Sequence, residues 1–114
     1  MEVDTFPGML GAVSGALAGA DRLALQVYAT TSSGHSIEWT GQRLRAAIRT
    51  YPHLEIVAGV AAYRQPGATD TQRAEHLRRA LGEASQAGCR VARLWSGKWL
   101  CRLPAKSWTR AALG

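Results

Sequence analysis

The run from Leu54 to Tyr63 restricts the fold more than any other segment. It combines Ile56, Val57 and Val60 with small residues and has no polar face. A short run that is apolar on both sides is typical of a central strand covered on both faces. Gly59 within it predicts the close approach of a packed helix. A strand of this kind indicates a sheet with β-α-β crossovers.

The segment that follows predicts a helix with clear ends. Thr69 and Gln72 fit a capping box, in which two side chains satisfy free amides at a helix start. The helix continues to about Ala87, and Gly88 fits its C-cap. Glu75 and Arg79 are spaced to form an ion pair on the outer side. The inward positions are Ala74, Leu77, Leu81 and Ala84.

A strand and a second helix are predicted before the central run. Apolar residues alternate from Leu23 to Thr31, which is the period of a strand, and Ser32 to Gly34 form a turn. His35 to Trp39 then fit either the second arm of a hairpin or a loop. Thr40 fits the cap of a helix that ends before Pro52. Its core stripe comprises Leu44, Ala47, Ile48 and Tyr51.

The C-terminal part predicts a β-hairpin from Cys89 to Leu103, with Ser96 and Gly97 as its turn and Pro104 as its end. This register places Cys101 opposite Ala92. One face of the hairpin then contains apolar residues that we expect to pack inward, namely Ala92, Leu94, Trp99, Cys101 and Leu103. The other face mixes cations and aromatics, namely Val91, Arg93, Trp95, Lys98, Leu100 and Arg102.

The apolar stretch near the N-terminus predicts a helix that begins at Pro7, after Asp4 or Thr5 as the cap. Gly11, Gly15 and Gly19 recur every four residues and form a strip without side chains. We expect this strip to be buried against the sheet or against a second copy of the chain. The run is too short to cross a bilayer, and its acidic start does not fit a secretory signal. No membrane partner is therefore expected.

Together these segments predict an α/β fold, with α+β as the alternative. The length of 114 residues, with 46% hydrophobic and 19% charged residues, fits one folded domain over residues 1–114. We expect two or three layers, with a mixed sheet of four to five strands and about three helices. The expected order is α-(ββ)-α-β-α-ββ.

The charge favours a polyanionic partner. The chain has 14 Lys and Arg against 8 Asp and Glu, a net charge of +6. A basic domain attracts nucleic acid, although codon bias in a GC-rich genome also enriches arginine. Cys89 and Cys101 are too few for a disulfide scaffold, and the predicted hairpin places them on opposite faces. Reduced thiols and a cytoplasmic location follow as expectations.

Motifs for catalysis or cofactor binding do not stand out. The glycines lack the strand and the Lys-Ser/Thr pair of a phosphate loop, and no Cys/His spacing fits zinc. No metal and no cofactor are expected. His35 and Glu38 are the one pair with acid–base potential, and a hydrolase that uses them is a distant third hypothesis.

The leading hypothesis is therefore a small non-enzymatic protein that binds DNA or RNA through the hairpin. Cations beside an exposed indole suit phosphates and a stacked base. The predicted contacts are Arg93, Trp95, Lys98 and Arg102, with Arg45 and Arg49 extending the basic surface. The alternative is a protein-interaction module, an inhibitor or adaptor. It would self-associate through Gly11, Gly15 and Gly19 and use Trp39, Trp95 and Trp108 as anchors.

Overall fold

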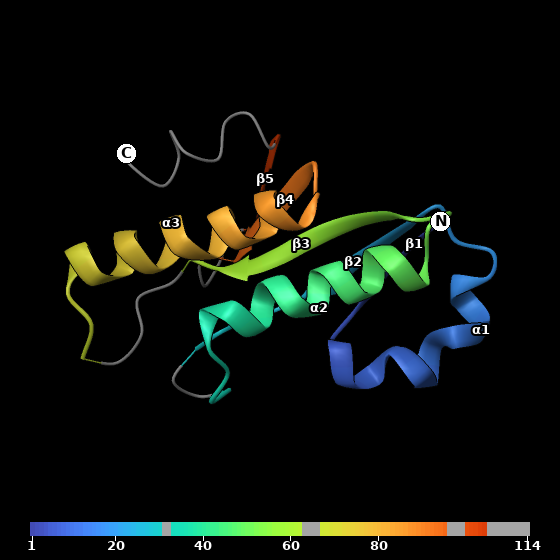
Figure 1. Cartoon of the computed structure of the whole chain (residues 1–114), viewed down its shortest axis with the longest axis horizontal. Coiled ribbons are helices and arrows are strands. Elements are labelled where there is room, and N and C mark those ends of the chain that lie inside the picture. Colours follow the sequence, from blue (N-terminus) through green and yellow to red (C-terminus); the bar gives the residue numbers. More distant parts are fainter. Residues whose placement is uncertain (31–32, 63–66, 96–99, 105–114) are drawn as a thin grey trace.

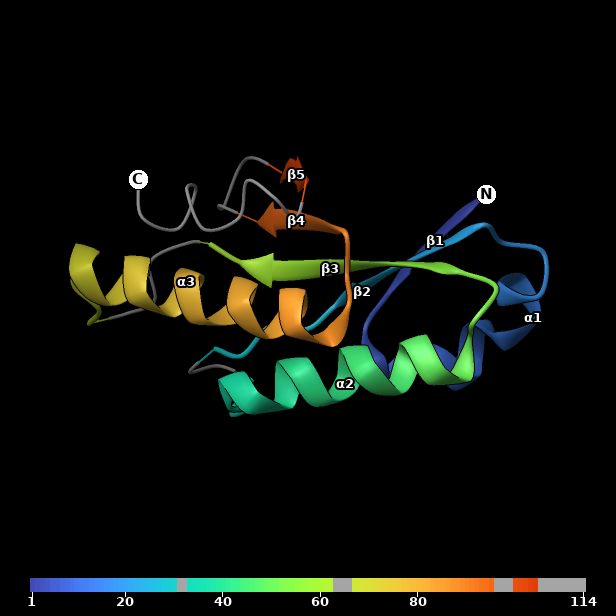
Figure 2. The same ribbon diagram turned by 45° about the horizontal axis from the view of Figure 1, so that its top comes forward.

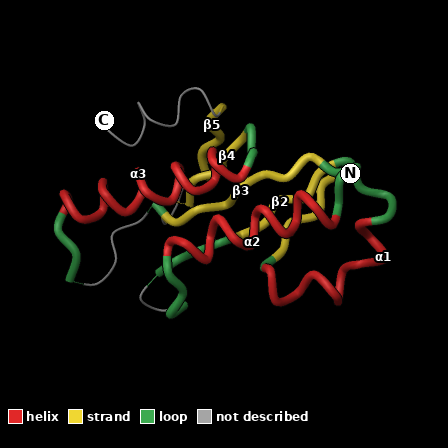
Figure 3. Tube along the Cα trace, viewed as in Figure 1, coloured by secondary structure: helices red, strands yellow, loops and turns green. Residues whose placement is uncertain are grey.

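The computed structural model describes residues 1–30, 33–62 and 67–95 with their side chains, and the backbone of 100–104. Its elements follow one another along the chain as Figures 1 and 3 show. The strands are β1 (Glu2–Thr5), β2 (Arg22–Gln26), β3 (Glu55–Ala61), β4 (Val91–Trp95) and β5 (Leu100–Pro104). The helices are the 3₁₀ helix η1 (Pro7–Val13) and the α-helices α1 (Ser14–Leu17), α2 (Ile37–Thr50) and α3 (Asp70–Ala87).

The five strands form one sheet in the order β1-β2-β3-β4-β5. β1 to β4 are parallel, and β5 is antiparallel to β4. The strands follow one another across the sheet in chain order, so right-handed crossovers place all their helices on one face. Figure 2 shows α2 and α3 on the same face of the sheet. The predicted α/β class and the mixed five-stranded sheet are confirmed. β3 is the central strand, as its apolar sequence predicts.

The core lies between this face and the helices. Alternate strand residues such as Leu23, Leu25 and Val60 are almost completely buried against Leu44 of α2 and Leu81 of α3. The predicted stripe on α2 faces this core. Burial of each large aliphatic side chain contributes roughly 1.5–3 kcal/mol, so this layer is the main source of stability.

Both long helices begin at side-chain caps. The Thr69 capping box forms as predicted, and Gly88 ends α3 in the left-handed conformation with φ of 104°. α2 begins earlier than predicted, because the Ser36 hydroxyl accepts the Trp39 N–H at 3.2 Å. Of the two alternatives for His35 to Trp39, the hairpin arm is wrong, and the loop holds only as far as Ser36, because Ile37 begins α2. Thr40 lies inside α2, where its buried hydroxyl donates to the Val27 carbonyl at 2.9 Å.

The N-terminal segment differs most from the prediction. Glu2–Thr5 form a strand, and one long helix is replaced by the short η1 and α1. Each glycine disfavours a helix by up to about 1 kcal/mol, which explains the interruption. Gly11, Gly15 and Gly19 are exposed, so they are not buried against this chain's own sheet. In the part of the chain that the structure describes, no helix has the length and apolarity to cross a membrane.

Replacing Gly15 by alanine is expected to raise the free energy of unfolding by about 0.4–1 kcal/mol. The position is helical, its φ is not positive, and an added methyl group would meet no atom within 4 Å. Gly88→Ala is the control, because its positive φ makes any side chain costly. Urea denaturation measures both. A loss of stability in Gly15→Ala would mean that the strip packs against another chain.

Candidate functional site

The sheet face opposite the described helices, here called the outer face, combines charged, small and aromatic residues. Glu2, Arg22 and Glu55 lie at the amino ends of their strands. Ala24, Val57 and Gly59 lie in the middle of the sheet. Phe6, Tyr28 and Trp95 lie at or just beyond the carboxyl ends of β1, β2 and β4. The outer face therefore has a charged end and an aromatic end.

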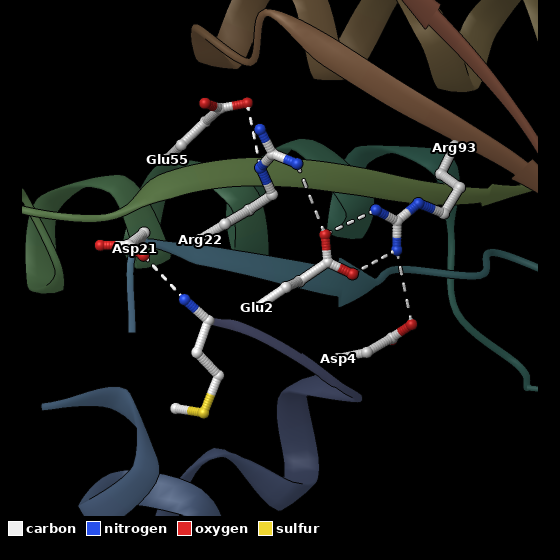
Figure 4. Close-up of polar contacts among 7 residues, drawn as sticks. Glu2, Asp4, Asp21, Arg22, Glu55 and Arg93 are labelled. Atoms are coloured by element: carbon white, nitrogen blue, oxygen red, sulfur yellow. Dashed lines mark hydrogen bonds and ion pairs between the residues drawn. The ribbon is translucent and has the colours of Figure 1, made fainter. Parts of the chain in front are cut away.

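An ion-pair network joins β1 to β2, β3 and β4 on the outer face (Figure 4). The Arg93 guanidinium donates to both Glu2 carboxylate oxygens at 2.7 Å and lies 3.6 Å from the Asp4 carboxylate. Arg22 lies 3.8 Å from Glu2 and 3.4 Å from Glu55. The hydrogen bonds to Glu2 raise the pKa of Arg93 above its ordinary value. Arg93 thus stays charged and is neutralised within the chain.

Small residues allow Arg93 to reach Glu2. The two residues lie on β4 and β1, with β3 and β2 between them, and three strand spacings amount to about 14 Å. Gly59 is the register partner of Arg93 on β3. Because Gly59 has no side chain and Ala24 has only a methyl group, the long arginine can lie across the sheet. The prediction that Gly59 allows a helix to pack closely is therefore wrong. An added Cβ at Gly59 would instead lie 3.3 Å from the Gln26 backbone.

A cavity of about 370 Å³ opens beside this network. Ala24 and Gly59 line its middle, and aromatic side chains line it from β4 and from the ends of β1 and β2. The Gln26 amide donates to the Asp4 carboxylate at 2.6 Å, which fixes its orientation because only the amide NH₂ can donate. The lining residues are Asp4, Phe6, Ala24, Gln26, Tyr28, Gly59, Arg93 and Trp95.

A second cavity of about 380 Å³ lies next to the first. The two share Phe6, Gln26 and Tyr28 as lining residues, and the Phe6 and Tyr28 rings meet edge to face at 6.2 Å. At the far side of the second cavity, the His35 ring stacks on Trp39 with centroids 3.7 Å apart. The two cavities therefore form a row lined by aromatic rings from four parts of the chain.

The row lies toward the carboxyl ends of the parallel strands, the end at which open α/β sheets bind ligands. In those sheets the crevice forms where the strand order reverses, whereas the order β1 to β4 has no reversal and the row lies on the outer face. Sequence reasoning missed Phe6 and Tyr28, because it did not predict β1. Each of these aromatic residues lies one or two positions after the end of a strand, and this position is the only sequence signal for the cavity. The signal becomes informative only when β1 and β2 are known to be neighbours in the sheet.

The structure separates the residues predicted to contact nucleic acid. Trp95 is 38% exposed and lines the first cavity. Arg93 is 7% exposed and bound to carboxylates, so a phosphate would have to displace Glu2. Arg45 and Arg49 lie on α2, in the helical layer, and Arg45 lies 3.9 Å from Glu83. The structure does not bring these two arginines together with Trp95.

The remaining predicted residues of the hairpin are described only in part. β5 pairs antiparallel with β4 as predicted, but Cys101 lies opposite Leu94 rather than Ala92, and Arg102 lies opposite Arg93. The register is shifted because the two strands are joined by four residues, 96 to 99, instead of two. Lys98, Trp99 and Trp108 lie outside the described residues.

His35 and Glu38 have different partners. The Glu38 carboxylate accepts a hydrogen bond from Arg79 at 3.1 Å, whereas the His35 ring stacks on Trp39. The predicted ion pair between Glu75 and Arg79 is therefore wrong. Glu75 pairs with Arg78 instead. A general base needs a partner that orients it, and Glu38 is bound to a cation instead. The geometry gives no support to the hydrolase hypothesis.

Comparisons with known proteins give little guidance. No protein-family model matches the sequence, and no curated protein matches it either. Among solved structures, the chain is similar to CetZ from Methanosaeta thermophila, with 15% sequence identity and a TM-score of 0.44. The match covers 94% of this chain and 32% of the CetZ chain, so the chain spans about a third of that protein. A likeness this weak supports no conclusion about function.

Proposed function

We propose that this domain binds single-stranded nucleic acid on the outer face of its sheet. The observation that supports this most is the half-exposed Trp95 at the first cavity, on a strand followed in the sequence by Lys98 and by Arg102 of β5. An indole can stack on any unpaired base, and neighbouring cations can neutralise the phosphates. A single strand is favoured over a duplex, because bases in a duplex are already stacked.

The distribution of charge along the chain supports the same proposal. Residues 1–83 contain all eight Asp and Glu and eight Arg, so the net charge of +6 belongs entirely to residues 84–114. Arg93 is neutralised by Glu2, which leaves Arg90, Lys98, Arg102, Lys106 and Arg110. A basic segment that contains Trp95 has the composition expected of a surface that follows a phosphate backbone.

The test is the salt dependence of binding to a fluorescein-labelled thymidine decamer, measured by anisotropy. The logarithm of affinity is expected to fall linearly with the logarithm of salt concentration, because each neutralised phosphate releases counterions. Replacing Arg102 or Lys98 by glutamine is expected to reduce the steepness by roughly 0.7–1 each. Arg49→Gln is the matched control. Arg49 is exposed at the end of α2, in the helical layer, and its loss is expected to leave the slope unchanged.

Trp95→Ala supplies the second readout of the same titration. It is expected to weaken binding about five- to 150-fold, the effect of one stacked base, without changing the slope. A surface that is merely basic would show the slope effect alone. If affinity for every single strand tested is weaker than about 10⁻⁴ M, which is the limit of ordinary non-specific binding, the proposal is wrong.

A protein-interaction module is the second candidate, and one observation favours it. Parallel sheets are ordinarily covered by helices on both faces, whereas the described helices cover only one face here. This candidate predicts no affinity for nucleic acid and the loss of a protein partner in Trp95→Ala. The exposed strip of Gly11, Gly15 and Gly19 would serve self-association, which analytical ultracentrifugation of Gly15→Leu would detect as a lost dimer.

A further inference from the structure

We infer that the first cavity is a pocket for one unstacked base, and that the second cavity receives the next base of the same strand. This inference rests on the proposed function and adds the site to it. The pocket lies between Trp95 of β4 and the aromatic pair Phe6 and Tyr28. Its volume of about 370 Å³ lies within the range of about 300–1,000 Å³ that is usual for small-ligand sites.

The shape of the pocket suits a flat ring. Ala24 and Gly59 are the smallest residues available, and they bring the strand backbone close to the surface of the sheet. Three of the side chains around them are aromatic, namely Phe6, Tyr28 and Trp95. A planar group that lies over small residues and meets ring faces and edges gains stacking energy without displacing any part of the chain.

The polar groups at the pocket favour an uncharged ligand with hydrogen-bonding edges. Arg93 is neutralised by Glu2, and Asp4 accepts a hydrogen bond from the Gln26 amide. A phosphate would face the Asp4 carboxylate here and would compete with Glu2 for Arg93, so it is disfavoured at this point. A base instead presents both donors and acceptors, and the Gln26 carbonyl oxygen can accept from a base N–H. The phosphates are left to the basic residues after Glu83.

The second cavity gives the direction of the strand. Since both cavities share Phe6 and Tyr28, a base in one lies next to a base in the other. The far side of the second cavity is the stacked pair of His35, which precedes the N-cap of α2, and Trp39 in its first turn. The strand therefore runs from Trp95 of β4 past β3 and β2 toward His35 and Trp39.

The experiment compares a thymidine decamer with an abasic decamer of the same sugar-phosphate backbone. The natural protein is expected to bind the thymidine decamer about five- to 150-fold more tightly than the abasic decamer, which is the effect of one stacked base. Ala24→Leu fills the pocket and is expected to reduce this preference by the same factor. Because a leucine also crowds the path of Arg93 to Glu2, the salt slope of this variant is measured as well; an unchanged slope shows that Arg93 has not been released. Ala74→Leu is the matched control and is expected to leave the preference unchanged, because Ala74 is exposed on α3. The prediction that Ala74 faces inward is therefore wrong.

Further variants separate the two cavities. Trp95→Ala lies at the exposed rim and tests the first pocket even if Ala24→Leu does not fold. Trp39→Leu keeps an apolar side chain on α2 but removes the ring surface of the second cavity. It is expected to weaken binding of the decamer and to leave binding of the abasic strand unchanged.

The outcomes distinguish this inference from the proposed function. Equal, salt-dependent affinity for the two strands would overturn the base pocket and leave polyanion binding intact. Absence of binding to either strand would overturn both. A preference for the base-bearing strand that survives both Ala24→Leu and Trp95→Ala would place the base elsewhere on the protein and overturn the inference.

Discussion

Replacing Arg93 by methionine is expected to lower the free energy of unfolding by about 2–3 kcal/mol. Methionine keeps the apolar part of the side chain but removes the guanidinium that bonds Glu2 and approaches Asp4. Breaking a fully buried pair costs about 3–5 kcal/mol. The side chains of Glu2 and Asp4 are 29% and 41% exposed, so their carboxylates regain part of their hydration and the cost is smaller.

Arg79→Met is the matched control for this experiment. Its partner is also a glutamate, but Arg79 and Glu38 are 49% and 61% exposed. Exposed pairs contribute about 0–1 kcal/mol and are screened by salt. Urea denaturation of both variants, together with Glu2→Gln and the double variant, gives the coupling energy between Arg93 and Glu2. Equal effects of the two arginine substitutions would contradict a special role for the link across the sheet.

The Cys89 thiol is expected to react with iodoacetamide at pH 8 about a thousandfold more slowly than an ordinary cysteine. Burial raises the pKa of this thiol to about 12, and only the thiolate reacts. Cys89 is 4% exposed and belongs to the core between the helices and the sheet. Occlusion of the sulfur slows the reaction further.

The measurement uses Cys101→Ser, so that Cys89 is the single thiol, and follows alkylation by mass spectrometry. The same variant in 6 M guanidinium is the control and is expected to react at the ordinary rate. The unfolded, non-reduced natural protein is expected to show two thiols, since Cys89 is free in the structure. Rapid alkylation of the native variant would mean that the end of α3 opens readily. A count of zero thiols would contradict the expectation of a reducing compartment.

Local sequence signals were sufficient wherever a segment meets its requirements by itself. The capping box at Thr69 and the left-handed Gly88 define α3, because both ends satisfy backbone groups within a few residues. The apolar run of β3 requires burial on both faces wherever it is placed. The alternation in the C-terminal hairpin predicted that Ala92 and Leu94 face the core, and both are buried.

Predictions failed where one segment depends on another far away in the sequence. Glu2–Thr5 contain two acidic residues, which are poor strand formers, so no local signal favours β1. They pair with β2 and receive hydrogen bonds from Arg93, which lies 91 residues from Glu2, and from Gln26. The same contact removes Arg93 from the set of residues free to bind a phosphate.

The sequence by itself therefore determined the α/β class, the ends of α3, the central strand and the position of the positive charge after Glu83. The tertiary structure alone decided that β1 is a strand and that Arg93 is internal. It also decided that Phe6, Tyr28 and Trp95 share one cavity. The physical reason is the distance in sequence between the residues involved. Helix caps and periodic patterns are satisfied between near neighbours. An ion pair across three strand spacings exists only once the sheet has assembled, and so does a cavity at the ends of three strands.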